Sequence, residues 1–227
     1  MRSAESYAGL RKNALDHAAR TEAEFRERLR REDVIGEWRF LESLPAETVA
    51  LHARYADLTI LGQVDPDATP SSNIGRIPEE VLFSSGGPML VIPYAGRFES
   101  IGENVLVAWK PTSESARALR DSLPILQQAK KVTVLTVNPD RDGDREPGIP
   151  AADIANHLAH HGVNVEAAST FAEDIGTADV LLNHASDCGA DLIVMGGYGH
   201  SRVTELVLGG VTREILHHMT VPVFMSH

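Results

Sequence analysis

The stretch Asp191-Leu-Ile-Val-Met-Gly-Gly-Tyr-Gly-His-Ser201 places a short apolar run directly before three glycines. Bounded apolar runs of this length are typical of buried strands. A second glycine pair, Gly209-Gly210, precedes Val-Thr-Arg-Glu-Ile-Leu, which has the pattern of a helix. Glycines permit close backbone approach and positive φ, and the N-terminus of a helix attracts anions. The connection between strand and helix is therefore a candidate phosphate-binding site, or else a tight turn without a ligand.

Length and composition indicate an ordinary globular protein. The chain has 227 residues, of which 43% are hydrophobic and 23% charged, enough for one or two domains with a real core. The net charge of −11 argues against general nucleic-acid binding, which needs clustered Lys and Arg. The apolar runs fall short of the roughly 20 residues that span a bilayer, and the opening Met-Arg-Ser-Ala-Glu-Ser is unlike a secretory signal. We therefore expect a cytoplasmic protein without membrane association.

Side chains that commonly bind metals offer little support for a metal site. Cys188 is the one cysteine, which excludes an intrachain disulfide and a cysteine cluster, and we expect it to be a small buried side chain. His157, His160 and His161 fall at i, i+3 and i+4 of an expected helix, but no carboxylate or cysteine set accompanies them. We therefore expect no metal centre.

The second half of the chain alternates strand and helix patterns. The expected strands are 104–109, 132–137, 163–167, 191–195 and 221–225. The expected helices are 113–129, 154–161, 178–186 and 212–218. Strands that alternate with crossover helices indicate a parallel sheet covered on both faces, so the fold class is a doubly wound α/β fold.

The first half of the chain repeats the end of the second at an offset of 134. Asp57-Leu-Thr-Ile-Leu-Gly62 aligns with Asp191-Leu-Ile-Val-Met-Gly196. At the same offset, Glu80-Val-Leu and Pro88-Met-Leu-Val align with Glu214-Ile-Leu and Pro222-Val-Phe-Met. This self-similarity predicts two copies of one domain, joined within 94–103. The predicted domains are residues 1–96 and 97–227.

The first copy is expected to lack its initial strand and helix. Subtracting 134 from Asn104 gives a position about 30 residues before Met1. In that place the chain opens with an expected polar helix, 4–31, whose plausible buried stripe is Leu10, Ala14, Ala18, Phe25 and Leu29. A length difference in a loop is the alternative. A natural short form, a late start codon and an artificial boundary all stay open.

The motif Gly196-x-x-Gly199, nine residues, then Gly209, followed by Val211-Thr212 and Val221-Pro222-Val223, resembles the universal stress protein family. The resemblance covers most of the chain, strongly over 104–227 and in degraded form over 38–94. It implies a Rossmann-like or flavodoxin-like α/β sandwich, here in two tandem copies, and a cytoplasmic role in stress survival. In some members it also implies binding of ATP or another adenine nucleotide.

The implied nucleotide site lies in the second copy. Backbone groups near the glycines would hold phosphates: Gly196, Gly199, Gly209, Gly210, Val211 and Thr212. Residues at the carboxyl ends of strands would line the base and ribose: Val107, Ala108, Val137 and Met195. Polar residues beside them are Lys110, His200 and Arg202. We expect Mg²⁺ only together with a bound nucleotide.

Two positions of the second copy depart from the family pattern. Gly210 stands where nucleotide-binding members have Ser or Thr, so one hydroxyl contact is missing while the backbone N–H stays. Lys110 stands where the family usually has an Asp at the end of the first strand, so an acceptor becomes a donor.

The first copy departs further from the pattern. At the offset of 134, Asp65, Arg76 and Pro78 occupy the positions of Gly199, Gly210 and Thr212, although Gly62 and Gly75 survive. An aspartate at a phosphate position repels the ligand, so we predict that the first copy binds no nucleotide.

Three functions stay open: a nucleotide-responsive stress protein, an interaction module without nucleotide, and a weak hydrolytic or phosphate-transferring enzyme. The sequence contains no Gly-x-Ser-x-Gly elbow, P-loop lysine or His-Glu-x-x-His pair, so we expect no catalysis. The run 221–225 can pair internally with the matching run 88–93. A missing first strand would leave a sheet face or edge uncovered, and we therefore expect a homodimer.

Overall fold

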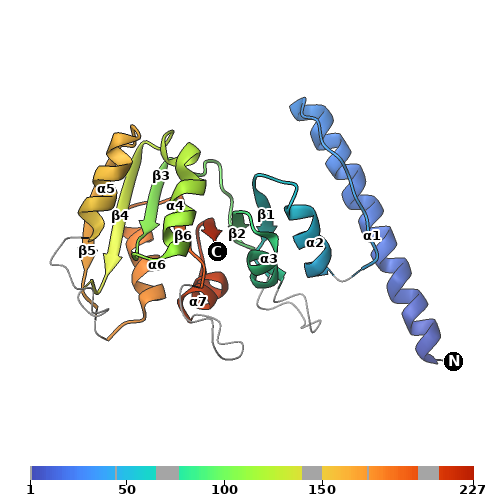
Figure 1. Cartoon of the computed structure of the whole chain (residues 1–227). Coiled ribbons are helices and arrows are strands. Elements are labelled where there is room, and N and C mark those ends of the chain that lie inside the picture. The colour runs from blue at the N-terminus through green and yellow to red at the C-terminus, as the bar shows by residue number, and fades with distance from the viewer. Residues whose placement is uncertain (1, 44, 65–76, 140–149, 173, 199–209) are drawn as a thin grey trace. The chain divides into compact units, whose positions relative to one another are not determined.

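The computed structural model describes residues 2–43, 45–64, 77–139, 150–172, 174–198 and 210–227 (Figure 1). The chain divides into two compact units, Met1–Leu44 and Pro45–His227. The expected boundary between residues 96 and 97 separates the two similar sequence copies and does not correspond to this division into compact units. It stays a prediction.

The first unit consists of the long helix α1 (Arg2–Glu32) and the segment after it, which returns along the helix (Figure 1). The rings of Phe25 and Trp38 lie 5.7 Å apart, and Arg11 forms an ion pair with Glu42 at 2.7 Å. Of the expected stripe, Ala18, Phe25 and Leu29 are half-buried while Ala14 is exposed. The side chain of Leu10 lies outside the described ones. None of the helices in the described ranges has both the length and the apolar character needed to cross a membrane.

The second unit contains one seven-stranded sheet with helices on both faces. Its elements are α2 (Pro45–Ala53), β1 (Thr59–Gly62), α3 (Ile77–Ser85), β2 (Met89–Ile92), β3 (Asn104–Ala108), α4 (Ser113–Leu126), β4 (Lys131–Val137), α5 (Pro150–His160), β5 (Val165–Thr170), α6 (Thr177–Asp187), β6 (Leu192–Gly196), α7 (Gly210–His218) and β7 (Val223–Ser226). The strand order is β1-β2-β7-β6-β3-β4-β5. The elements of the second copy follow in the order that the sequence pattern predicts.

The strand pairings reproduce the offset of 134. Thr59 pairs with Met89 in the first copy, and Ile193 pairs with Val223 in the second, so both pairs of strands have the same register after the shift. Strands β2 and β7 pair antiparallel, centred on Leu90 and Phe224, and 224 − 90 is again 134. The two copies are therefore related by an approximate dyad at this pair.

The prediction of two tandem parallel-sheet sandwiches needs one correction. The sheet is single and mixed, because the expected internal pairing of 88–93 with 221–225 joins both copies edge to edge in antiparallel orientation. Within 2–43 and 45–58 no strand precedes β1, so the first copy supplies two strands to this sheet and the second copy supplies five.

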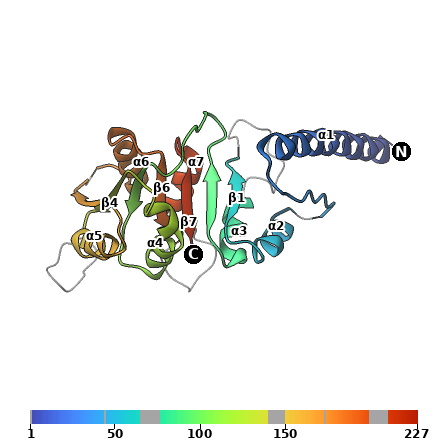
Figure 2. The ribbon, with the colours of Figure 1, turned by 90° about the horizontal axis from the view of Figure 1, so that it is seen from above.

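Two apolar clusters cover the two faces of the sheet. Helices α4 and α5 pack on one face, against residues such as Val107 and Phe224. Helices α2, α3, α6 and α7 contribute to the cluster on the other face, with Met195 and Met225. Figure 2 shows α4 and α5 on the opposite side of the strands from α6 and α7. Strands buried on both faces explain the continuous apolar runs in the sequence.

Candidate functional site

The candidate site lies at the carboxyl ends of two neighbouring strands whose following helices pack on opposite faces of the sheet. Strands β3 and β6 are parallel neighbours, and Ala108 pairs with Met195 at their carboxyl ends. The helix after β3, α4, packs on one face of the sheet, while the helix after β6, α7, packs on the other. Connections that leave neighbouring strands toward opposite faces open a crevice at the carboxyl ends, which is where open α/β sheets bind ligands.

Gly196, the last residue of β6, lies against the first turn of α4. A Cβ at this position would come within 2.5 Å of the Ser115 backbone nitrogen and 2.7 Å of the Glu114 carbonyl carbon. Backbone atoms cannot move aside as side chains do, so only glycine fits between strand and helix. Close packing therefore explains Gly196, while its expected role in phosphate binding stays a prediction.

The next two residues are held from several sides, and we call Gly196–Tyr198 the loop root. The Gly197 N–H donates a hydrogen bond to the Ser226 carbonyl at 2.9 Å, and a Cβ on Gly197 would come within 2.5 Å of Leu82 Cδ2 in α3. Tyr198 has φ +57°, and its N–H donates to Thr212 Oγ1 at 3.2 Å. The Thr212 side chain, only 3% exposed, thus binds the loop root, a role that sequence reasoning missed.

The first turn of α7 contains the expected backbone donors Gly210, Val211 and Thr212. The first four N–H groups of a helix have no partner within the helix and are available to an anion. A Cβ on Gly210 would meet no atom of the described chain within 4 Å. None of the described residues therefore occupies the place of a side chain at Gly210. Gly199, His200, Arg202 and Gly209 lie outside the described residues.

The expected base and ribose residues divide between the two faces of the sheet. Ala108 and Met195 are register partners, and both belong with Val137 to the cluster on the face of α6 and α7. Val107 points to the opposite face and packs in the cluster of α4 and α5. Successive side chains of a strand face opposite sides, so Val107 and Ala108 are separated by the sheet. That all four residues line one pocket stays a prediction. Lys110 is half-buried, two residues before Thr112, the N-cap of α4.

Glu114 adds a carboxylate at the start of α4, which the sequence analysis did not single out. Burial alone would raise the pKa of its carboxyl group. Hydrogen bonds from its own N–H and from the Ser113 and Thr112 hydroxyls, together with nearby His227, bring that pKa below its ordinary value. An acidic residue in the first turn is favourable for a helix. The signal available in the sequence was Thr112-Ser113-Glu114, a typical helix start.

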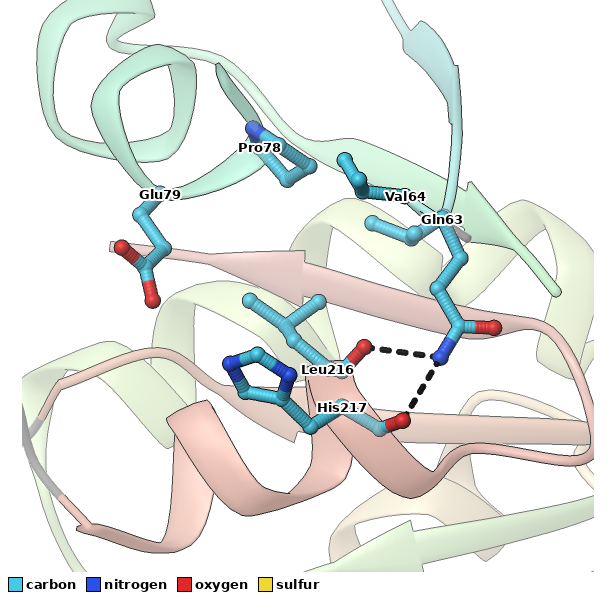
Figure 3. Close-up of a pocket in the computed structure, with 7 residues that line it drawn as sticks. Gln63, Val64, Pro78, Glu79, Leu216 and His217 are labelled. Carbon is cyan, nitrogen blue, oxygen red and sulfur yellow. Dashed lines mark hydrogen bonds between the residues drawn. The ribbon is translucent and has the colours of Figure 1, made fainter. Parts of the chain in front are cut away.

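The first copy has a small pocket at the position of its own loop root (Figure 3). Gln63, the counterpart of Gly197, donates hydrogen bonds from Nε2 to the carbonyls of Leu216 at 2.9 Å and His217 at 3.0 Å. Pro78, Glu79 and these α7 residues line a volume of about 70 Å³. Nucleotide-sized sites typically have about 300 Å³ or more. That the first copy binds no nucleotide stays a prediction. Asp65, Gly75 and Arg76 lie outside the described residues.

Possible metal ligands stay scattered. The rings of His157 and His161 are 4.8 Å apart in an edge-on arrangement on the exposed side of α5. Within the described ranges, no three His, Cys, Asp or Glu side chains gather into a group that could hold a metal ion. Cys188 is a half-buried free thiol whose Sγ lies 3.7 Å from the Ala185 carbonyl oxygen.

Comparison with known proteins places this architecture in a family. The profile of the universal stress protein family matches residues 102–227, more than half of the chain. The chain belongs to the universal stress protein family. Universal stress protein Slr1230 of Synechocystis is 28% identical to this universal stress protein over 172 residues, which are 74% of this chain and 56% of that protein. The chain thus spans little more than half of the length of this curated relative.

Solved universal stress proteins share the fold. A universal stress protein from Archaeoglobus fulgidus DSM 4304 matches 92% of this chain and 75% of its own, with a TM-score of 0.72 and 18% identity. A putative universal stress protein from Pseudomonas aeruginosa UCBPP-PA14 matches 91% of this chain and 77% of its own, with a TM-score of 0.61 and 16% identity. A shorter match, over 56% of this chain and 97% of its own at 18% identity, is a universal stress protein from Archaeoglobus fulgidus in complex with dAMP, with a TM-score of 0.41.

Proposed function

We propose that this universal stress protein binds an adenine nucleotide in its second copy and that occupancy of this site changes how the protein meets partners in the stress response. The observation that carries the proposal is the junction of β3 and β6. Their carboxyl ends lie side by side, and the helices that follow them leave toward opposite faces. The loop root and the first turn of α7 border this crevice, which offers backbone N–H groups to phosphate.

The chain's own residues suggest how such a ligand would bind. The N–H groups of Gly210, Val211 and Thr212 would hold phosphate oxygens. Ala108 and Val137, half-buried near the ends of neighbouring strands, would border the base and ribose. Lys110 would supply a positive charge to a phosphate, and Mg²⁺ would enter only with the nucleotide.

The competing proposal is an interaction module without nucleotide. It is favoured by the packing roles of Gly196 and Gly197, which explain two glycines without a ligand. It is also favoured by Glu114 at the start of α4, because its carboxylate would repel a phosphate in the crevice. Under either proposal the protein acts by binding and not by catalysis, in the cytoplasm.

Released ligand and thermal shift test the nucleotide proposal directly. The protein is purified without added nucleotide and denatured, and the supernatant is analysed for adenine nucleotides. ATP, AMP and dAMP are then added at millimolar concentration, with and without Mg²⁺, while the melting temperature is measured. We expect copurified nucleotide or a raised melting temperature. If no nucleotide is released and the melting temperature does not change, the nucleotide proposal is refuted and the interaction module remains.

Gly210 gives a matched pair of variants for the same question. G210S adds the hydroxyl that nucleotide-binding members of the family carry, and G210A adds only the Cβ, for which there is room. A net hydrogen bond contributes about 0.5–1.5 kcal/mol. We therefore expect the Kd for ATP, measured by isothermal calorimetry, to be roughly two- to tenfold lower for G210S than for G210A. Equal affinities would place the phosphates away from α7.

A further inference from the structure

A residue of the first copy packs on the loop root of the second copy. The ring of Phe83, in α3, stacks on the ring of Tyr198 with centroids 4.5 Å apart and an angle of 26° between the planes. Phe83 is 42% exposed, whereas Tyr198 is only 8% exposed beneath it. The first copy therefore supplies one of the contacts that cover Tyr198.

Tyr198 needs this support because of its backbone conformation. A φ of +57° is uncommon for a residue with a Cβ, and such conformations persist only where the surroundings impose them. The stack with Phe83 fixes the ring, and the hydrogen bond to Thr212 fixes the N–H. Since Thr212 lies in the first turn of α7, these contacts set the position of the loop root relative to the helix N-terminus.

Neighbouring contacts hold Gly197 in the same way. The Leu82 side chain fills the space where a Cβ on Gly197 would be. The His227 ring lies edge-on to Phe83 at 4.6 Å, and its Nδ1 is 3.1 Å from the Gly197 carbonyl oxygen. Two consecutive residues of α3, Leu82 and Phe83, thus contact two consecutive residues of the loop root.

The contact has no equal on the other side of the dyad. The offset of 134 relates Phe83 to His217 and Tyr198 to Val64. There, His217 and Val64 line the small pocket, and Gln63 connects the copies by hydrogen bonds to backbone carbonyls. Among the residues that the structure describes, the aromatic stack lies at the loop root of the second copy and has no counterpart at 62–64.

We propose that Phe83 is a positioning residue through which the first copy holds the loop root of the second copy in the conformation that binds nucleotide. The proposal deepens the proposed nucleotide binding and depends on it for its effect on affinity. The first copy then contributes to a site that it does not itself contain. Loss of the ring frees Tyr198 to leave the left-handed region, and the loop root must then regain its conformation each time a nucleotide binds.

The test compares F83A, the conservative variant F83Y and the dyad-related control H217A. The Kd for ATP is measured by calorimetry, and the exchange rates of the Gly197 and Tyr198 amide protons are measured by NMR in nucleotide-free protein. The interaction free energy of an aromatic pair corresponds to roughly a two- to tenfold change in an equilibrium constant. We expect F83A to weaken ATP binding and to accelerate amide exchange by such a factor, F83Y to restore both, and H217A to change neither.

The two readouts separate this proposal from the proposed function. If the wild-type protein does not bind ATP, the proposed nucleotide binding is refuted. Accelerated amide exchange in F83A would still support the positioning role of Phe83 in that case. Unchanged exchange of the Tyr198 amide in folded F83A would overturn the positioning role, whatever the affinity for ATP. If F83A does not fold, F83L keeps an apolar side chain without the ring and is measured in its place.

Discussion

At the scale of residues, each residue of the loop root makes packing contacts that the glycine motif in the sequence does not identify. Gly196 contacts α4, Gly197 contacts α3 and β7, and Tyr198 contacts α3 and α7. The sequence indicates that backbone approaches something closely at these glycines. It does not indicate whether the partner is a helix or a phosphate, because both demand a missing side chain. Leu82, which packs on Gly197, lies more than a hundred residues before it in the sequence.

Replacing Gly196 or Gly210 by alanine tests whether a side chain at each position would collide with its surroundings. G196A should destabilise the protein by about 1–3 kcal/mol, since its Cβ would press on the backbone of α4. For G210A we expect a change in the free energy of unfolding between zero and about 1 kcal/mol of added stability. The reason is that its Cβ meets none of the described atoms within 4 Å, and the unfolded chain loses freedom. Urea unfolding measures both. Equal stability of the two variants would contradict the contact between Gly196 and α4.

At the scale of elements, the sequence predicted the order of strands and helices well. Apolar runs marked β3, β4, β6 and β7, because these strands are largely buried, whereas the edge strand β5 is partly exposed along its length. Boundaries were less exact: α5 begins at Pro150 and not near Ile154, since proline is well suited to a first helical position. Alternation along β3 places Val107 on the opposite face from Ala108, so their shared part in a nucleotide pocket stays a prediction.

The link between Gln63 and α7 could not be predicted from the sequence. Its partners are backbone carbonyls of another copy, and backbone groups carry no sequence signal. Gln63 is buried, and it also accepts a hydrogen bond from the Tyr94 N–H at 3.2 Å. The carbonyls at the end of a helix have no partner within it, so a side chain donor satisfies them.

Replacing Gln63 tests the strength of this link between copies. Q63A removes both hydrogen bonds to α7 and should lower the free energy of unfolding by about 1–3 kcal/mol, because buried acceptors lose their donor. Q127A is the matched control, since Gln127 donates to the His161 carbonyl at 2.9 Å in an exposed position. The control should change stability by less than about 0.5 kcal/mol. A similar loss in both variants would argue against a special role for Gln63.

At the scale of the whole molecule, one edge of the sheet in the second unit has no further strand paired to it among the described residues. Strand β1 is the outermost strand, and Ile60 on it is 61% exposed. In the second copy, the strand that corresponds to β1 is β6, and β3 lies beside it. An edge with an exposed apolar side chain is a natural site for pairing with another chain.

We expect the protein to form a homodimer through this edge. Light scattering after gel filtration should give twice the chain mass at micromolar concentration. I60K should shift the protein to monomer, raising the dissociation constant at least about tenfold, because a charge would be buried at the contact. F171K, at an exposed position beyond the opposite edge strand, should leave the dimer intact. A wild-type protein that is monomeric throughout this range would refute the expectation.

The antiparallel pair of β2 and β7 has a consequence for concentration dependence. Two halves that meet around Leu90 and Phe224 on separate chains would come apart on dilution, as any bimolecular complex does. Here the segment between β2 and β3 tethers them, so their effective concentration is fixed by the length of that tether and not by the amount of protein. The stacking of Phe83 on Tyr198 is thereby maintained in a cell that contains only a few molecules of this protein.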